Sequence, residues 1–163
     1  MIMAEHDRIL HCAIEAHGGR VLQAVGDGVY AVFASAGETA LAAVQAQTAL
    51  QQLVVPDVGP LRVRMAIHTG VGPTALKACL RLLGIARGEQ VLISGATADC
   101  LCAVLPSSAA LRPLGRHRMG ELRPPEDVFQ LVDAQMRSAL LPLRSRWYQR
   151  WRRYTKELKQ RLS

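Results

Sequence analysis

One acidic residue stands where it could do chemistry. Asp27 lies between Gly26 and Gly28, and the apolar runs RVLQAV and VYAVF flank these three residues. An Asp-Gly pair suits the positive backbone angles of a two-residue hairpin turn. A carboxylate at the same place could also hold a metal ion or contact a phosphate. The local sequence leaves both interpretations open.

A second pattern with possible chemistry is the segment GVGPTA, residues 70–75, which follows a strand-like stretch and opens a helix-like one. It satisfies the loose form GxGxxA of a dinucleotide-binding turn, and Glu89 lies further along as a candidate acid. That acid should close the second strand, whereas Glu89 precedes the apolar stretch VLIS. We therefore disfavour dinucleotide binding.

The sequence gives little support for acid–base catalysis by histidine or for metal binding by cysteine. His68 lies on the polar side of an alternating stretch, where we expect a partly buried, hydrogen-bonded imidazole rather than an acid–base group. No pair of nucleophile and base indicates hydrolysis. The cysteines have no metal-ligand spacing, and we expect them to be reduced and buried. They are Cys12, Cys79, Cys100 and Cys102.

The net charge of +7 belongs to the end of the chain. Residues 134–163 carry nine Lys or Arg and one acidic residue, whereas residues 1–133 carry 11 and 12. This basic tail could bind anionic lipid or nucleic acid, or it could pack on the domain or on a second copy. Its apolar residues recur at helical spacing, at Trp147, Trp151, Tyr154, Leu158 and Leu162.

The elements that would position these residues form an α/β plan. We expect one domain over residues 1–133 and a helical tail over 134–163. The absence of a leader or an apolar spanning run favours the cytoplasm. Apolar periodicity predicts helices over 5–16, 37–53, 73–85 and 95–105, strands over 20–25, 29–33, 61–70 and 89–94, and two extended segments within 111–132.

Five segments, in this order, resemble the catalytic domain of class III adenylate/guanylate cyclases, in its bacterial branch. They cover residues 5–133 and read HDRIL…AIEAHGG, VGDGVYAVF, LRVRMAIHTG, RLLGIARGEQVLIS and LGRHRMGEL…PEDVFQLV. The resemblance implies a ferredoxin-like nucleotidyl cyclase fold of the α+β type. It also implies a dimer, with itself or with another cyclase domain, that holds ATP or GTP at the interface.

The resemblance further implies which residues form the site. Asp27 matches the second of two aspartates that hold Mg²⁺ or Mn²⁺, and we expect the chain to start downstream of the strand that carries the first one. Gln23 stands where the family has a purine-reading Lys. Lys77 stands at the place of a ribose-orienting Asn, or Leu76 does if the gap is placed one residue differently, so the Asn is absent either way. Arg81 matches the Arg that stabilises the transferring phosphates.

These matches predict a cyclase-like domain in cyclic-nucleotide signalling that is degenerate and inactive on its own, because metal and substrate contacts are incomplete. Two alternatives remain. The chain could be a non-catalytic module that binds nucleotide or pairs with an intact cyclase, or an adaptor that uses its basic tail. We also expect unpaired strand edges where the family's central opening strand would lie.

Overall fold

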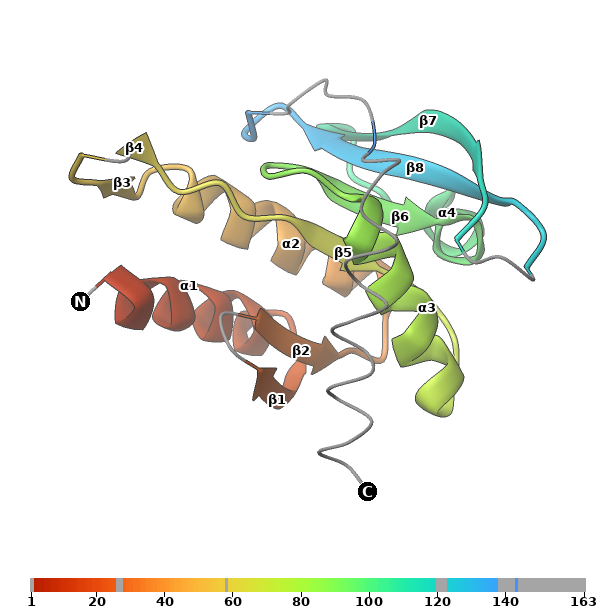
Figure 1. The fold of residues 1–163 in the computed structure, drawn as a ribbon, viewed down its shortest axis with the longest axis horizontal. Helices are drawn as coiled ribbons and strands as arrows, with labels where there is room; N and C mark the ends of the chain where they lie inside the picture. The colour runs from red at the N-terminus through yellow and green to blue at the C-terminus, as the bar shows by residue number, and fades with distance from the viewer. Residues whose placement is uncertain (1, 26–27, 58, 120–122, 138–142, 144–163) are drawn as a thin grey trace.

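Figure 1 shows the fold in a computed structural model of the protein. The structure describes residues 2–25, 28–57, 59–119, 123–137 and 143. The turn at Asp27 lies outside the described residues, and so does the aromatic stripe of the tail. None of the helices in these described ranges has the length and apolar character that spanning a bilayer requires.

A helix and a hairpin form the N-terminal part of the fold. Helix α1 (Ile2–Ala16) leads into the antiparallel strands β1 (Arg20–Val25) and β2 (Gly28–Val32). Between α1 and β1 the chain turns at Gly19, where an added Cβ would lie 2.4 Å from the ring of Phe33. Only glycine leaves room for that ring. The predicted helix and hairpin are confirmed, and α1 extends three residues further toward its N-terminal end than expected.

Helix α2 (Ala36–Leu50) follows the hairpin. The Ser35 side chain caps it by accepting a hydrogen bond from the Glu38 backbone N–H at 3.3 Å, which satisfies one of the free donors of the first turn. After α2 comes a short antiparallel pair, β3 (Val54–Val55) and β4 (Gly59–Pro60), which the sequence did not predict.

The largest sheet has the order β5-β6-β8-β7 (Figure 1). Strands β5 and β6 are parallel, and helix α3 connects them; β8 is antiparallel to both of its neighbours. Helix α4 follows β6 directly. The bounds of these elements are β5 (Met65–Ile67), α3 (Gly72–Ile85), β6 (Val91–Ser94), α4 (Gly95–Leu101), β7 (Ala109–His117) and β8 (Glu126–Asp133).

Apolar side chains cover both faces of this sheet. On one face, Ile93 and Leu131 pack against α2 and α4. On the other face, Leu92 and Val128 pack against α3, with Leu82 at the centre of the contact. Strand β6 is therefore fully buried, as expected for a strand with neighbours on both edges and helices on both faces.

The hairpin and the large sheet are not joined. Strands β1 and β2 form a sheet of their own, and β5 is one of the two edge strands of the four-stranded sheet. In Figure 1 the hairpin lies beside α1, on the opposite side of β5 from β6. Within the described residues, no strand bridges the hairpin and β5, in line with the unpaired edges expected from the sequence.

Three sequence predictions need correction. The strand expected over 61–70 is limited to Met65–Ile67. Before it, the Leu61 N–H donates to the Leu53 carbonyl, and the Val63 carbonyl accepts from both the Glu89 N–H at 2.7 Å and the Gln47 side chain at 3.1 Å. The second and fourth predicted helices end earlier than expected, at Leu50 and Leu101.

The burial predicted for the cysteines is also wrong. Three of the residues are exposed, namely Cys12, Cys100 and Cys102, and Cys79 as a whole residue is half-buried. The prediction rested on the apolar neighbours of each cysteine in the sequence. Such neighbours do not show whether a helical residue faces the solvent or the core. All four cysteines are free.

Candidate functional site

Helix α3 carries two of the predicted site residues. Lys77 and Arg81 are one helical turn apart and share a face; Lys77 is exposed and Arg81 is half-buried. Pro73 in the first turn favours the start of the helix here, and the burial of Leu82 holds it on the sheet. The helix, which is held on the sheet by this packing, thus carries two cationic side chains on one face.

The other two predicted residues lie elsewhere. Gln23 is exposed on β1, opposite Tyr30 of β2, and Asp27 lies outside the described residues. Within the described ranges, no hydrogen bond or ion pair joins Gln23 to Lys77 or Arg81. The structure therefore places the two α3 residues together and leaves Gln23 on the separate hairpin.

The connection from β5 into α3 is the glycine-containing segment noted in the sequence. Gly72 adopts a left-handed φ of 63°, and the N-cap residue Val71 offers no side-chain cap. Glu89 lies before β6 rather than at its end. This β5-α3-β6 unit is a parallel crossover, but its acid is not placed as in a dinucleotide site.

A polar cluster lies where β5 and β6 end. His68 Nδ1 is 2.9 Å from Ser94 Oγ, and Ser94 Oγ is 3.1 Å from Thr97 Oγ1. Thr69 Oγ1 lies 3.0 Å from Thr97 Oγ1. The expected hydrogen-bonded histidine is confirmed. The sequence analysis did not identify its partner, Ser94. Because β5 and β6 are adjacent parallel strands connected by α3, their carboxyl ends lie side by side.

The Ser94–His68 pair is not arranged for nucleophilic attack on a substrate. Ser94 is only 2% exposed, and its hydroxyl accepts from the Thr97 N–H at 3.4 Å as the cap of α4. Burial lowers the pKa of His68, and the Glu126 carboxylate opposes that effect. The cluster is thus a set of structural hydrogen bonds that connects the end of β5 with the end of β6 and the start of α4.

Cys79 fastens α3 to β5 on the sheet face next to this cluster. Its thiol donates to the Ala66 carbonyl at 3.2 Å. Burial raises the pKa of this thiol to about 11, so Cys79 stays protonated at neutral pH.

The metal site implied by the resemblance does not fit the described residues. Among them, no three His, Cys, Asp or Glu side chains come together to hold an ion. Asp27, the one predicted ligand, lies outside that part of the chain. We therefore derive no reaction step through a metal ion.

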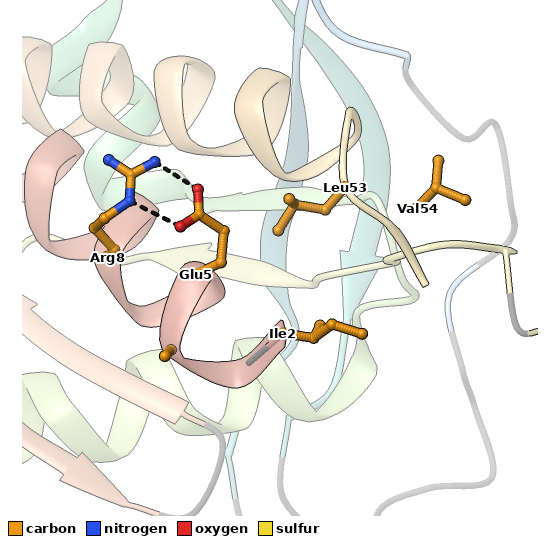
Figure 2. Close-up of a pocket in the computed structure, with 6 residues that line it drawn as sticks. Ile2, Glu5, Arg8, Leu53 and Val54 are labelled. Carbon is orange, nitrogen blue, oxygen red and sulfur yellow. Dashed lines mark hydrogen bonds and ion pairs between the residues drawn. The ribbon is translucent and has the colours of Figure 1, made fainter. Parts of the chain in front are cut away.

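A surface hollow of about 500 Å³ lies away from α3 (Figure 2). It is mainly apolar and lies between the first turns of α1 and the residues after α2, where Ile2, Leu53 and Val54 line it. The Arg8 guanidinium donates to the Glu5 carboxylate along its wall. None of the predicted site residues lines this hollow.

Comparison with curated proteins gives relatives from mycobacteria, and no family model matches the chain. The uncharacterized protein Rv0891c of Mycobacterium tuberculosis is 35% identical over 154 residues, which are 88% of this chain and 51% of the relative. Uncharacterized protein Rv1359 of the same species is 31% identical over 150 residues, 83% of this chain and 55% of the relative. The chain thus spans about half the length of the curated relatives it matches.

Solved structures give a consistent fold. An adenylate cyclase from Trypanosoma brucei, studied in its monomeric state, superposes with a TM-score of 0.70 at 16% identity and covers 89% of this chain and 83% of its own. An adenylate/guanylate cyclase/hydrolase from Silicibacter pomeroyi gives 0.63 at 23% identity, over 76% of each chain.

A third neighbour is the catalytic core of a rhodopsin-guanylyl cyclase with converted specificity, solved with ATPαS. It gives a TM-score of 0.65 at 10% identity over 80% of each chain. The helices and the mixed sheet described above have the arrangement seen in these proteins. The protein therefore has the fold of the class III adenylate/guanylate cyclase catalytic domain, as its sequence segments indicated.

Proposed function

We propose that this chain is a cyclase-like domain of nucleotide-linked signalling that does not form a cyclic nucleotide on its own. The main support is the composition of the α3 face, which presents Lys77 and Arg81 where the family would have an Asn and an Arg. An ammonium group can contact phosphate, but it cannot accept the hydrogen bond from a ribose hydroxyl that an amide oxygen accepts. Substrate positioning is weakened accordingly.

The need for two bound metal ions also supports the proposed lack of cyclase activity. Two ions in an in-line phosphoryl displacement need more than one carboxylate to hold them. Asp27 is the one residue of this chain that matches the family's aspartate pair. We propose that Asp27 alone would bind Mg²⁺ or Mn²⁺ weakly and would leave the transition state under-stabilised.

The test is a direct assay of the purified 163-residue chain. ATP and GTP are each supplied with excess Mn²⁺, and cyclic AMP and cyclic GMP are measured by mass spectrometry. We expect no product above the level of an Asp27→Ala chain. Product that disappears in the Asp27→Ala chain would show a working metal site and overturn the proposal.

A second candidate function is nucleotide binding without turnover, either alone or beside an intact cyclase domain. The observation that favours it is the pair of cations on one face of α3, which suits a triphosphate. We expect ATP or GTP to raise the melting temperature. A ligand at 100 times its Kd stabilises the folded state by about 2.7 kcal/mol.

Charge-matched variants separate specific binding from general attraction. Lys77→Ala and Arg81→Ala should each reduce the nucleotide-dependent shift in melting temperature. Arg123→Ala removes an exposed charge from the β7–β8 connection, which is not part of the α3 face, and should leave the shift intact. Equal losses in all three variants would mean that nucleotides bind by net charge alone.

A further inference from the structure

The loop from β5 into α3 forms an exposed, uncharged tip. All residues from 69 to 74 are exposed, and none of them carries a charge. Val71 is 90% exposed, which makes it the most exposed of the large apolar residues that the structure describes. Pro73 is exposed beside it, and Leu76, about one turn further along the helix, is 44% exposed. These three side chains give the start of α3 an apolar surface.

The tip projects from the fold. Figure 1 shows the first turns of α3 at the end of the helix that lies farther from the large sheet. A Cβ added to Gly72 would meet no atom of another segment within 4 Å, so the space beside the backbone is open. Leu82, in the second half of α3, is fully buried on the sheet. The packing therefore holds the second half of α3 and leaves its first turn exposed.

Local structure gives no reason for an apolar side chain at the tip. Val71 is the N-cap residue of α3, with φ −120° and ψ 145°, and its side chain makes no capping hydrogen bond. Polar residues such as serine and asparagine are strongly preferred at an N-cap, and valine is among the poorest choices. Packing does not explain the valine either, because the residue is so exposed. An apolar partner outside the described residues would account for it.

The tip belongs to a cationic part of the chain. Residues 58–88 include five Lys or Arg and no Asp or Glu. Two of these cations, Lys77 and Arg81, lie on α3 behind the tip. Near the end of β5, the half-buried Glu126 of β8 acts on His68 and offsets part of this charge. The balance on α3 itself remains positive.

The segment after β8 adds to this positive charge. Leu143 packs on the α3 side of the sheet, against the cluster that contains Leu82. The twenty residues that follow Leu143 carry eight Lys or Arg and one acidic residue. Because an extended chain spans up to about 3.5 Å per residue, a segment tethered at Leu143 has these cations within reach of the tip.

An apolar tip among cations suits the surface of an anionic membrane. Aliphatic side chains enter the boundary between headgroups and acyl chains, while Lys and Arg attract the anionic headgroups. A second copy of this chain would bring the same positive charge and would be repelled. Nucleic acid would attract the cations, but its bases stack on aromatic side chains rather than on Val71 or Leu76. The combination favours lipid.

We propose that the start of α3 is a membrane-docking site for anionic phospholipid, in which Val71 and Leu76 enter the headgroup region and the cations of α3 and of residues 144–163 attract the headgroups. The chain would then lie on the membrane surface and would not span it. The proposal goes beyond the cyclase-like function and nucleotide binding, because it needs neither substrate nor turnover.

The experiment measures co-sedimentation of the full chain with vesicles of phosphatidylcholine, with and without phosphatidylserine. We expect binding to the vesicles that contain phosphatidylserine, and weaker binding as the salt concentration rises. Val71→Ser and Leu76→Gln should each weaken this binding by about tenfold, because one aliphatic side chain no longer enters an apolar phase. Val54→Ser is the matched control and should bind normally, since Val54 is 69% exposed on β3, at the other end of the fold (Figure 1).

The two test variants should fold. Serine is a better N-cap residue than valine, so Val71→Ser should leave the urea midpoint unchanged or raise it. Glutamine has a helix propensity close to that of leucine, which makes Leu76→Gln a second, independent variant. Val71→Ser retains Lys77 and Arg81 and should keep any ATP-dependent shift in melting temperature. Membrane docking and nucleotide binding can therefore fail separately.

Three results would overturn the proposal. The first is a failure of the unchanged chain to bind vesicles that contain phosphatidylserine at low salt. The second is binding by Val71→Ser and Leu76→Gln that is as tight as that of Val54→Ser, which would mean that charge alone attracts the vesicles. The third comes from a parallel titration with double-stranded DNA. If Val71→Ser loses DNA binding and keeps vesicle binding, the partner is nucleic acid.

Discussion

At the scale of single residues, the buried polar side chains of helix α2 and of its C-cap residue Gln51 differ in their hydrogen bonding. Gln51 uses its whole amide group: Nε2 donates to the Arg137 carbonyl at 2.6 Å, and Oε1 accepts from the Arg137 N–H at 2.8 Å. In contrast, the buried Gln47 Oε1 and Thr48 Oγ1 have no hydrogen-bond partner among the described residues. An unpaired buried oxygen lowers stability, because it has lost its water without a replacement.

Thr48→Val should therefore leave stability unchanged or raise it by up to about 1 kcal/mol, since valine has nearly the same shape and no unpaired hydroxyl. The measurement is the free energy of unfolding in urea. Thr39→Val is the matched control in the same helix. Its hydroxyl donates to the Ser35 carbonyl at 2.7 Å, and its loss should cost about 1 kcal/mol. Equal losses in both variants would show that Thr48 has a partner.

At the scale of elements, the start of α2 depends on one serine side chain. Ser35 has an extended backbone and its oxygen accepts from Glu38, so Ser35→Ala should lower the free energy of unfolding by about 1 kcal/mol. Ser35→Asn should retain most of the stability, because asparagine caps helices equally well. The result to the contrary would be an Asn variant as unstable as the Ala variant.

The elements with strong local signals were predictable from the sequence. The periodicity of α1 and the two apolar runs around Asp27 predicted the helix and the hairpin. The strand expected over 61–70 was too long, because its first residue, Leu61, donates its N–H to the Leu53 carbonyl near the end of α2 instead of to a strand of the large sheet. Short strands such as β3 carry too few residues to show a pattern.

The same limit applies to the candidate site. The resemblance located Gln23, Lys77 and Arg81 on the right kinds of element, and the role of each stays a prediction. The contact between His68 and Ser94 joins residues 26 positions apart. It depends on two strands lying parallel, which no local pattern reveals. The exposure of Cys100 and Cys102 was likewise decided by packing, not by composition.

At the scale of the whole molecule, the folded domain extends past the last strand. Met136 is buried, Leu143 packs on the α3 side of the sheet, and the Arg137 guanidinium donates to the Gln51 carbonyl at 2.8 Å. The segment after β8 is thus fastened to the end of α2. A truncation that removes the tail but keeps the domain intact must therefore retain Arg137 and Leu143.

A chain truncated after Asp133 should be less stable than one truncated after Leu143. Removal of Arg137 leaves the Gln51 amide, in a residue only 4% exposed, without its partners, at a cost of about 1–3 kcal/mol. Urea unfolding of the two truncated chains measures the difference, and equal stability would contradict it.

The chain truncated after Leu143 also tests the basic tail. If the tail binds anionic vesicles or DNA, the full chain should bind them in a salt-dependent way, and this truncated chain should lose that binding while keeping its stability.

The separation of the two sheets has a mechanical consequence. The hairpin packs on α1, and α1 packs on α2; His17 links them, with its Nδ1 2.8 Å from Glu38 and its Nε2 2.9 Å from Gln45. In the described residues, no backbone hydrogen bond crosses from residues 2–33 to residues 36–137. A rocking movement of residues 2–33 against residues 36–137 would thus strain side-chain packing and the two hydrogen bonds of His17, but it would separate no pair of strands.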